Sequence, residues 1–192
     1  MPVTIAEDRP RLTTRLRDGS EALLSPLTAE DGDLLEEGLE HLSIESRFAR
    51  FGQGLSHLSH SEVEYLTNVD QRDHVAWGAI VDGEAAGAGR YIRIPSAGCA
   101  EIAVTVIDEF QRRGLGMLLL EALTAVARVD DVDAFCFGIV PDNLPVRHIV
   151  ERLEVPLTDS ESLLEGRIDL TDIQKGPLED EMVSVMIEVR GG

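Results

Sequence analysis

Two glycines and two arginines stand together in the segment Gln111-Arg-Arg-Gly-Leu-Gly116, between strand-forming residues and a long apolar run. If a helix begins here, its first turn offers unpaired backbone N–H groups and the positive end of the helix dipole. Glycine lets an anion approach that backbone closely, and Arg112 and Arg113 add positive charge. The segment therefore indicates a phosphate-binding helix start, although a tight turn with solvated arginines would have the same composition.

Two familiar phosphate-binding loops do not fit this segment. A P-loop requires the pattern GxxxxGK[ST], and the chain contains no Lys-Ser or Lys-Thr pair. A dinucleotide-binding turn requires a third glycine for close packing of the helix on the sheet, but Leu119 stands at that position. A different class of phosphate-binding protein has to be considered.

One carboxylate, Glu101, interrupts the apolar, strand-like run Cys99–Val106 that precedes the glycine segment. In a strand, Glu101 lies on the same face as Ala103 and Thr105. We expect partial burial there, which would make the carboxylate a better acceptor for a proton. Glu101 is thus the candidate general base, and the alternative is a glutamate on a sheet edge or a solvent-facing surface.

The bulk composition narrows the possible partners. The chain has 192 residues, which indicates one domain, and a net charge of −19 with a pI near 4.5. This charge argues against binding to nucleic acid or to an anionic membrane, and it would attract a cationic substrate. An acidic surface can also serve solubility alone.

The sequence also predicts where the chain resides and what it lacks. The N-terminus has no apolar signal-peptide core, and no apolar run reaches the roughly 20 residues of a membrane span, so we expect a cytoplasmic protein. Cys99 and Cys136 lie in apolar runs and are expected to be buried, reduced thiols. Neither has a neighbour at metal-ligand spacing, so no metal is expected.

Periodicity and turn residues predict an α+β order of elements. A loose tail over 1–10 precedes a hairpin around Asp18-Gly19. Helices are expected from Thr28, from Ser59, over 114–129, and from an Asp142 cap to near Leu153. Strands are expected over 74–81, 85–94, 99–106 and 134–140, and more weakly over 164–170 and 182–189.

In this setting the glycine segment matches the pattern Q/R-x-x-G-x-G/A, and the chain resembles the GNAT superfamily of acyl-CoA-dependent N-acyltransferases. The motifs LRDGS (16–20), SRFARF (46–51), LTNVD (66–70) and AEIAVTV (100–106) are similar to those of the Pat-type bacterial protein lysine acetyltransferases. The resemblance covers about residues 10–155. It implies a single GNAT-like domain over 1–192, with a mixed, mostly antiparallel central sheet flanked by helices. Strands in 156–192 would complete that sheet.

The resemblance also implies how acetyl-CoA would bind as cosubstrate. Backbone amides of residues 112–117 would hold its pyrophosphate, and Ile102–Val106 would pair with its pantetheine arm after splaying away from 134–140. Asn143 in Pro141-Asp-Asn143 would contact the same arm, although it is also an ordinary helix cap. The cofactor-binding candidates are Val104, Thr105, Val106, Gln111, Arg112, Arg113, Gly114, Leu115, Gly116, Met117 and Asn143.

For catalysis, the resemblance implies that Glu101 accepts a proton from the acceptor amine and that a backbone N–H near Val104 stabilises the oxyanion. Many family members carry an acidic tyrosine where this chain has Val150. A thiolate leaves readily without such an acid, so activity does not require it. The usual Gly-Phe of the family is replaced by Glu154-Val155, so the substrate-side loop is expected to differ. His74 and Tyr91 are alternative bases or substrate contacts, although both are more typical of structural residues at strand ends.

These residues predict transfer of an acetyl group to an amine, and a protein lysine is the preferred acceptor. A small-molecule amine is the first alternative. The second is a catalytically silent acyl-CoA sensor, for which the missing tyrosine is the support. A homodimer is left open.

Overall fold

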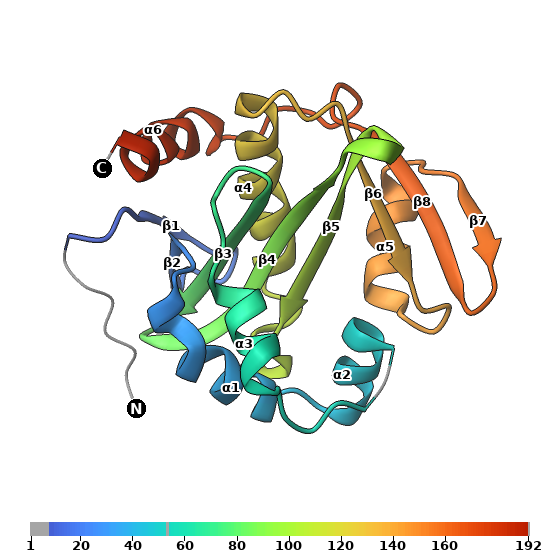
Figure 1. Cartoon of the computed structure of the whole chain (residues 1–192), viewed down its shortest axis with the longest axis horizontal. Helices are drawn as coiled ribbons and strands as arrows, with labels where there is room; N and C mark the ends of the chain where they lie inside the picture. The colour runs from blue at the N-terminus through green and yellow to red at the C-terminus, as the bar shows by residue number, and fades with distance from the viewer. Residues whose placement is uncertain (1–7, 53, 192) are drawn as a thin grey trace.

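The computed structural model describes residues 8–52 and 54–191, so most of the expected N-terminal tail lies outside the described residues. One eight-stranded sheet runs through the molecule in the order β1-β2-β3-β4-β5-β6-β8-β7 (Figure 1). All neighbouring strands are antiparallel except β5 and β6, which confirms the mixed, mostly antiparallel α+β sheet. The strands are β1 (Leu12–Arg15), β2 (Glu21–Pro26), β3 (His74–Val81), β4 (Glu84–Ile94), β5 (Cys99–Val106), β6 (Ala134–Ile139), β7 (Leu157–Ser160) and β8 (Leu163–Asp169).

Helices cover the two faces of this sheet. Apolar side chains of α4 pack beneath Gly89, while the neighbouring residue Arg90 points to the opposite face, beneath α1 and α2. Trp77, Tyr91 and Phe135 are fully buried in the core. The α-helices are α1 (Gly32–Glu40), α2 (Ile44–Phe51), α3 (His60–Thr67), α4 (Leu115–Val129), α5 (Leu144–Arg152) and α6 (Glu179–Gly191). None of the helices in the described ranges has the length and apolar character needed to cross a membrane.

Local signals in the sequence explain most element boundaries. Gly19 and Gly83 have positive φ values of 91° and 86° in the two hairpin turns, where glycine avoids the strain that a side chain would bring. Ser59 and Glu62 form a capping box at the start of α3, where the sequence predicts a helix to begin. The Thr28 side chain and the Asp31 carboxylate form a second one, which opens a short 3₁₀ turn (Ala29–Asp31) before α1.

The parallel strands β5 and β6 separate soon after they meet. Only Ala100↔Phe135 and Glu101↔Cys136 are paired across them, whereas β5 is paired with β4 over its whole length. The two strands then diverge, as Figure 1 shows, so one backbone edge of residues 102–106 has no neighbouring strand. The expected splay is therefore present, and it begins directly after Glu101.

Three expectations about individual helices and strands were wrong or incomplete. Residues 182–189 lie in helix α6 and do not form a strand. Their apolar residues fit both a period of two and a helical spacing, and the helix buries Met182 and Met186. Helix α2 was not predicted, and Asn143 caps α5 in place of Asp142.

The expectation of reduced thiols was also wrong. Cys99 and Cys136 form a disulfide, with a Cα–Cα distance of 5.9 Å. The two residues are 37 positions apart in sequence, and only the parallel pairing of β5 with β6 brings them together. The disulfide closes the narrow end of the splay, beside Glu101.

We expect the disulfide to stabilise the fold measurably. Replacing Cys136 with Ser should lower the free energy of unfolding by about 2–4 kcal/mol, because the closed loop restricts the unfolded chain. Urea unfolding with and without a reducing agent measures this, and the Cys136→Ser variant should not respond to the reductant. Equal stability of the oxidised and reduced wild-type protein would contradict the expectation.

Candidate active site

The start of α4 leaves its first backbone amides available to a ligand. Gly114 occupies the N-cap position with φ of +97°, a conformation that favours glycine, and no side chain caps the helix. By contrast, side chains of Ser43, Ser59 and Asn143 cap α2, α3 and α5. A Cβ atom at Gly116 would contact only Val106 Cγ2, at 3.7 Å, so the space above this turn is open. The geometry can accommodate an anion.

The two arginines of the segment have different roles in the structure. The Arg113 guanidinium forms ion pairs with Asp18 at 2.5 Å and Asp82 at 3.5 Å, and it donates to Ser20 Oγ. Arg113 therefore ties the loop to the two hairpins. Hydrogen bonds from Ser20 and from Arg113 lower the pKa of Asp18 to about 2.

Arg112 is exposed and, within the described residues, makes no side-chain hydrogen bond or ion pair. A third arginine lies at the same helix start, although the sequence did not single it out. Arg17 of the first hairpin passes Gly114, with its Cγ atom 3.5 Å from the place that a Cβ there would occupy. Ninety-seven positions separate the two residues in sequence, and only the docking of the hairpin on the loop brings them together.

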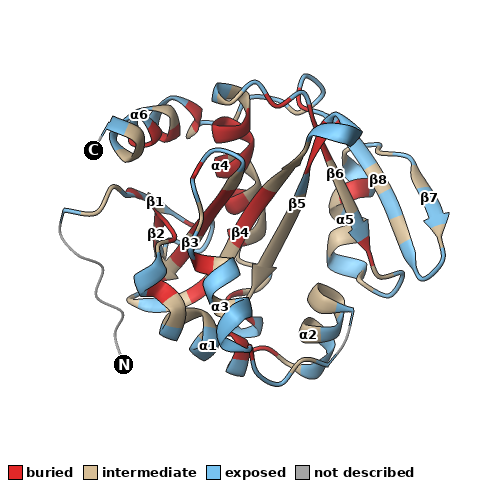
Figure 2. Ribbon diagram, viewed as in Figure 1, coloured by how far each residue is buried: buried red, intermediate tan, exposed pale blue. Residues whose placement is uncertain are grey.

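The open edge of β5 leads from this helix start into the sheet. All residues over 102–106 are only half-buried, although β5 lies in the middle of the sheet (Figure 2). Backbone groups of a strand point to alternate edges, and Thr105 O lies on the side of Gly87 in β4. Val104 and Val106 thus present backbone groups toward the splay, as a ligand with amide groups requires. Gln111 has a structural contact here, since its Nε2 donates to Val106 O at 3.1 Å and to Ser46 Oγ at 3.2 Å.

Glu101 lies where β5 and β6 separate, and its side chain shares the sheet face of Ala103 and Arg90. It is exposed, so the expected partial burial was wrong. Glu101 acts electrostatically on Arg50 of α2. Burial lowers the pKa of Arg50, and the negative charge of Glu101 partly opposes that effect.

Helix α2 is fastened to the end of β5 by a small polar network. The Asp108 carboxylate accepts hydrogen bonds from Ser43 N at 3.0 Å, Ser43 Oγ at 2.7 Å and Ser46 Oγ at 3.0 Å. Burial alone would raise the pKa of Asp108, but these hydrogen bonds lower it on balance. The network fixes α2, and with it Arg50, over the splay.

The remaining candidates divide between structural and accessible positions. Tyr91 is buried on the α4 side and donates to Asp130 Oδ2 at 2.5 Å, so it is not placed to act as a base. Burial and the charge of Arg90 lower the pKa of His74, whose neutral ring accepts from Arg90 Nη1 at 3.2 Å. Asn143 Oδ1 caps α5 by accepting from Val146 N at 3.3 Å, which leaves its amide group for other contacts. Val150 is buried.

An uncapped, basic helix start and an open strand edge that leads to a carboxylate are the features of the acyl-CoA-dependent N-acyltransferase fold. The sequence profile of the Acetyltransferase (GNAT) family matches residues 39–154, and the chain belongs to this family.

Known proteins support this assignment and the resemblance to the Pat branch. The acetyltransferase Pat of Mycolicibacterium smegmatis is 29% identical over 178 residues, which span 90% of this chain and 53% of that protein. An acetyltransferase of Pseudomonas aeruginosa is 33% identical over 117 residues, 59% of this chain and 63% of the relative. The chain thus spans about half to two thirds of the length of these curated relatives.

Solved structures give the same result for the fold. The GNAT domain of S. lividans PAT superposes with a TM-score of 0.78 at 28% identity, over 87% of this chain and 99% of that domain. A cAMP-binding acyltransferase from Mycobacterium smegmatis superposes with a TM-score of 0.67 at 26% identity, over 95% of this chain and 55% of that protein.

The helix start can be tested with a single glycine. Gly116→Val should lower acetyl-CoA affinity by about tenfold or more, because the added side chain occupies the approach of a phosphate to the backbone. The fold should persist, since the space at Gly116 is open, whereas Gly114→Val would be strained at positive φ. Calorimetry measures the affinity, and Gly54→Val, at another open position, is the matched control. Wild-type affinity in Gly116→Val would show that the phosphates of acetyl-CoA do not bind at this helix start.

Replacing the three arginines should affect acetyl-CoA affinity differently, depending on whether each guanidinium already forms ion pairs. We expect Arg112→Ala and Arg17→Ala each to weaken acetyl-CoA binding by about two- to fivefold at low salt, with a smaller loss at high salt because exposed charges are screened. Arg113→Ala should affect binding less, because the Arg113 guanidinium is already paired with Asp18 and Asp82. Titrations at two ionic strengths measure this. A larger, salt-dependent loss in Arg113→Ala than in the other two variants would reverse the assignment.

Proposed function

We propose that the chain transfers an acetyl group from acetyl-CoA to the side-chain amine of a protein lysine, with Glu101 as general base. The observation that carries this proposal is the divergence of β5 from β6 directly after Glu101. It places a free backbone edge between the uncapped start of α4 and an accessible carboxylate, so one extended thioester can contact all three. Membership of the GNAT family and similarity to Pat support acetyl-CoA as the donor.

In this proposal the pyrophosphate binds the first turn of α4, near Arg112 and Arg17. The pantetheine arm then follows Val104–Val106 along the open edge, next to Asn143. Its amide groups pair with the strand as an added strand would. This positions the thioester beside Glu101, at the point where the sheet opens.

The chemistry at that point requires a neutral amine. A lysine ammonium has a pKa near 10.4, so a base has to remove a proton before attack on the thioester carbonyl. Glu101 is exposed on the same face as α2, where an acceptor can reach it. The C–S bond then breaks, the attacking nitrogen loses its second proton, and the departing thiolate takes up a proton through solvent. A backbone N–H near Val104 would stabilise the oxyanion that forms first.

A protein acceptor is favoured by the surface around the opening. Ile44 and Phe48 of α2 and Leu144 of α5 are 72%, 50% and 67% exposed. Helices α2 and α5 flank the open end between β5 and β6 in Figure 1. These apolar side chains give a polypeptide acceptor a surface to contact beyond its lysine.

Glu101→Gln tests the base. The variant should retain acetyl-CoA affinity, since the side chains are nearly isosteric, and lose about 10²–10⁴-fold in turnover, the usual contribution of positioned acid–base catalysis. Wild-type kcat/KM should fall at acidic pH as the carboxylate is protonated, and the variant should lack this acidic limb. The residual rate should rise more steeply with pH, because only free amine reacts.

The measurement is a pH–rate profile of both proteins with an acceptor found by mass spectrometry after incubating cell lysate with labelled acetyl-CoA. Full activity with an unchanged pH–rate profile in Glu101→Gln would refute the role of Glu101 as general base. Acetylated metabolites without acetylated protein lysines would refute the protein acceptor. Tight acetyl-CoA binding without any turnover would instead support a silent sensor.

A further inference from the structure

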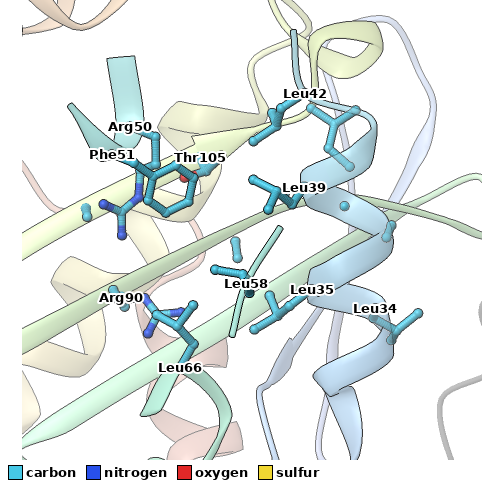
Figure 3. A pocket seen from close by; sticks show the side chains of 16 residues that line it. Leu34, Leu35, Leu39, Leu42, Arg50, Phe51, Leu58, Leu66, Arg90 and Thr105 are labelled. Carbon is cyan, nitrogen blue, oxygen red and sulfur yellow. The ribbon is translucent and has the colours of Figure 1, made fainter. Parts of the chain in front are cut away.

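A pocket of about 90 Å³ lies on the acceptor side of the sheet, between α1–α3 and strands β4 and β5 (Figure 3). Most of its wall is apolar. Leucines from α1, α3 and the loop before α3 line it: Leu34, Leu35, Leu39, Leu58 and Leu66. Within this apolar wall, Arg50 and Arg90 also border the cavity, as the sticks in Figure 3 show.

Arg90 is buried and forms no ion pair with another described residue. The residue is 7% exposed, and the one hydrogen-bond partner of its side chain in the described part of the chain is the neutral ring of His74. Arg50 is half-buried above it and contacts the Phe51 ring, with its guanidinium carbon 5.1 Å from the ring centre. Neither guanidinium forms an ion pair within the described ranges.

This arrangement costs free energy in the absence of an anion. Burying an unpaired charge is unfavourable, and two like charges in one pocket increase the cost. Burial and the neighbouring Arg50 lower the pKa of Arg90 to about 10, which still leaves the guanidinium charged at neutral pH. An anionic group in the pocket would offset both penalties and would accept hydrogen bonds from the unused guanidinium nitrogens.

The position of Arg90 relative to Glu101 indicates which molecule would carry the anionic group. Arg90 is opposite Ala103 in the β4–β5 ladder, and Glu101 is two residues further along β5 on the same face. Diagonal neighbours of this kind have Cα atoms about 7–8 Å apart. An amine at Glu101 and an anion at Arg90 are therefore close enough to belong to one molecule, separated by a short spacer.

We propose that Arg90, assisted by Arg50, binds a carboxylate side chain that lies close in sequence to the acceptor lysine. This inference rests on the proposed function and names its substrate class, a lysine accompanied by a neighbouring aspartate or glutamate. The cavity, about 90 Å³, has room for a carboxylate group. The rest of the acceptor then lies outside, against the exposed Ile44 and Phe48, which favours a polypeptide over a free amino acid. The acidic surface of this chain would repel such a carboxylate, so a local pair of arginines is needed to bind it.

The test compares matched acceptor peptides with acetyl-CoA as donor. One series carries a lysine with a glutamate one to four residues away, and the control series carries glutamine at the same position. Wild type should acetylate the glutamate peptides with a roughly 10–100-fold higher kcat/KM, the range expected for hydrogen bonds between charged groups. The difference should lie in KM.

Arg90→Met should remove this preference, so that its kcat/KM values for the glutamate and glutamine peptides become equal. Arg50→Met should reduce the preference in part, and Arg90→Lys should retain part of it, because lysine keeps the charge without the planar fork. Arg152→Met removes one exposed arginine that has no partner among the described residues, and it is the matched control for net charge.

Thermal unfolding shows whether Arg90 binds substrate or instead stabilises the fold. Because Arg90 is a buried charge without an ion pair in the described part of the chain, Arg90→Met should unfold at the same temperature as wild type or higher. A lower unfolding temperature with equal losses on both peptide series would overturn the proposal and make Arg90 structural. Equal kcat/KM for the two series in wild type would also overturn it, while still supporting lysine acetylation. If Arg90→Met lost activity only with succinyl-CoA as donor, the arginines would bind the acyl group of the donor, which would overturn the proposal. If wild type acetylated only free amino acids, in a way that depends on Arg90, the peptide acceptor would be excluded. Absence of any peptide acetylation by wild type would refute the proposed function itself.

Discussion

The end of pairing between β5 and β6 after Glu101 is the constraint on which the rest of the site depends. A parallel pair inside a sheet normally continues along both strands, because unpaired backbone groups in the interior are costly. Here two residue pairs and the Cys99–Cys136 disulfide hold the strands at one end, and the other end is open. The backbone groups left unpaired are a binding surface for a ligand that carries its own amides. Glu101, the last residue of β5 that pairs with β6, stands at the start of that surface.

Positive charge is concentrated around the candidate site, although the chain as a whole is strongly acidic. With a net charge of −19, the protein repels anions at long range, yet four arginines lie around the proposed path of the substrates. Arg112 and Arg17 lie near the start of α4, where the helix dipole has the same sign. Arg50 and Arg90 lie on the other face of the sheet, in an apolar pocket. Arg113, which looks equivalent to Arg112 in sequence, instead holds two hairpins together through Asp18 and Asp82.

The sequence predicted those parts of the fold that depend on local patterns. The spacing of leucines in α4, the glycine hairpins and the capping boxes each specify their element within a few residues. The glycine segment and the position of Glu101 before it located the candidate site. Features that depend on distant contacts were missed. The disulfide joins residues 37 positions apart, Arg17 approaches Gly114 only after the hairpin docks, and the exposure of Glu101 depends on where β6 diverges. Helix α6 was missed because its apolar residues fit two periods, and contact with the core decides between them.

Amide hydrogen exchange in the presence and absence of acetyl-CoA tests the central claim most directly. If the open edge of β5 and the uncapped start of α4 bind the donor together, exchange should slow in both 102–106 and 112–117 when acetyl-CoA is added. The hairpin of β7 and β8 should exchange as before. Protection of 112–117 without any change in 102–106 would show that the phosphates bind but that the thioester arm does not follow the splay, which would contradict the account.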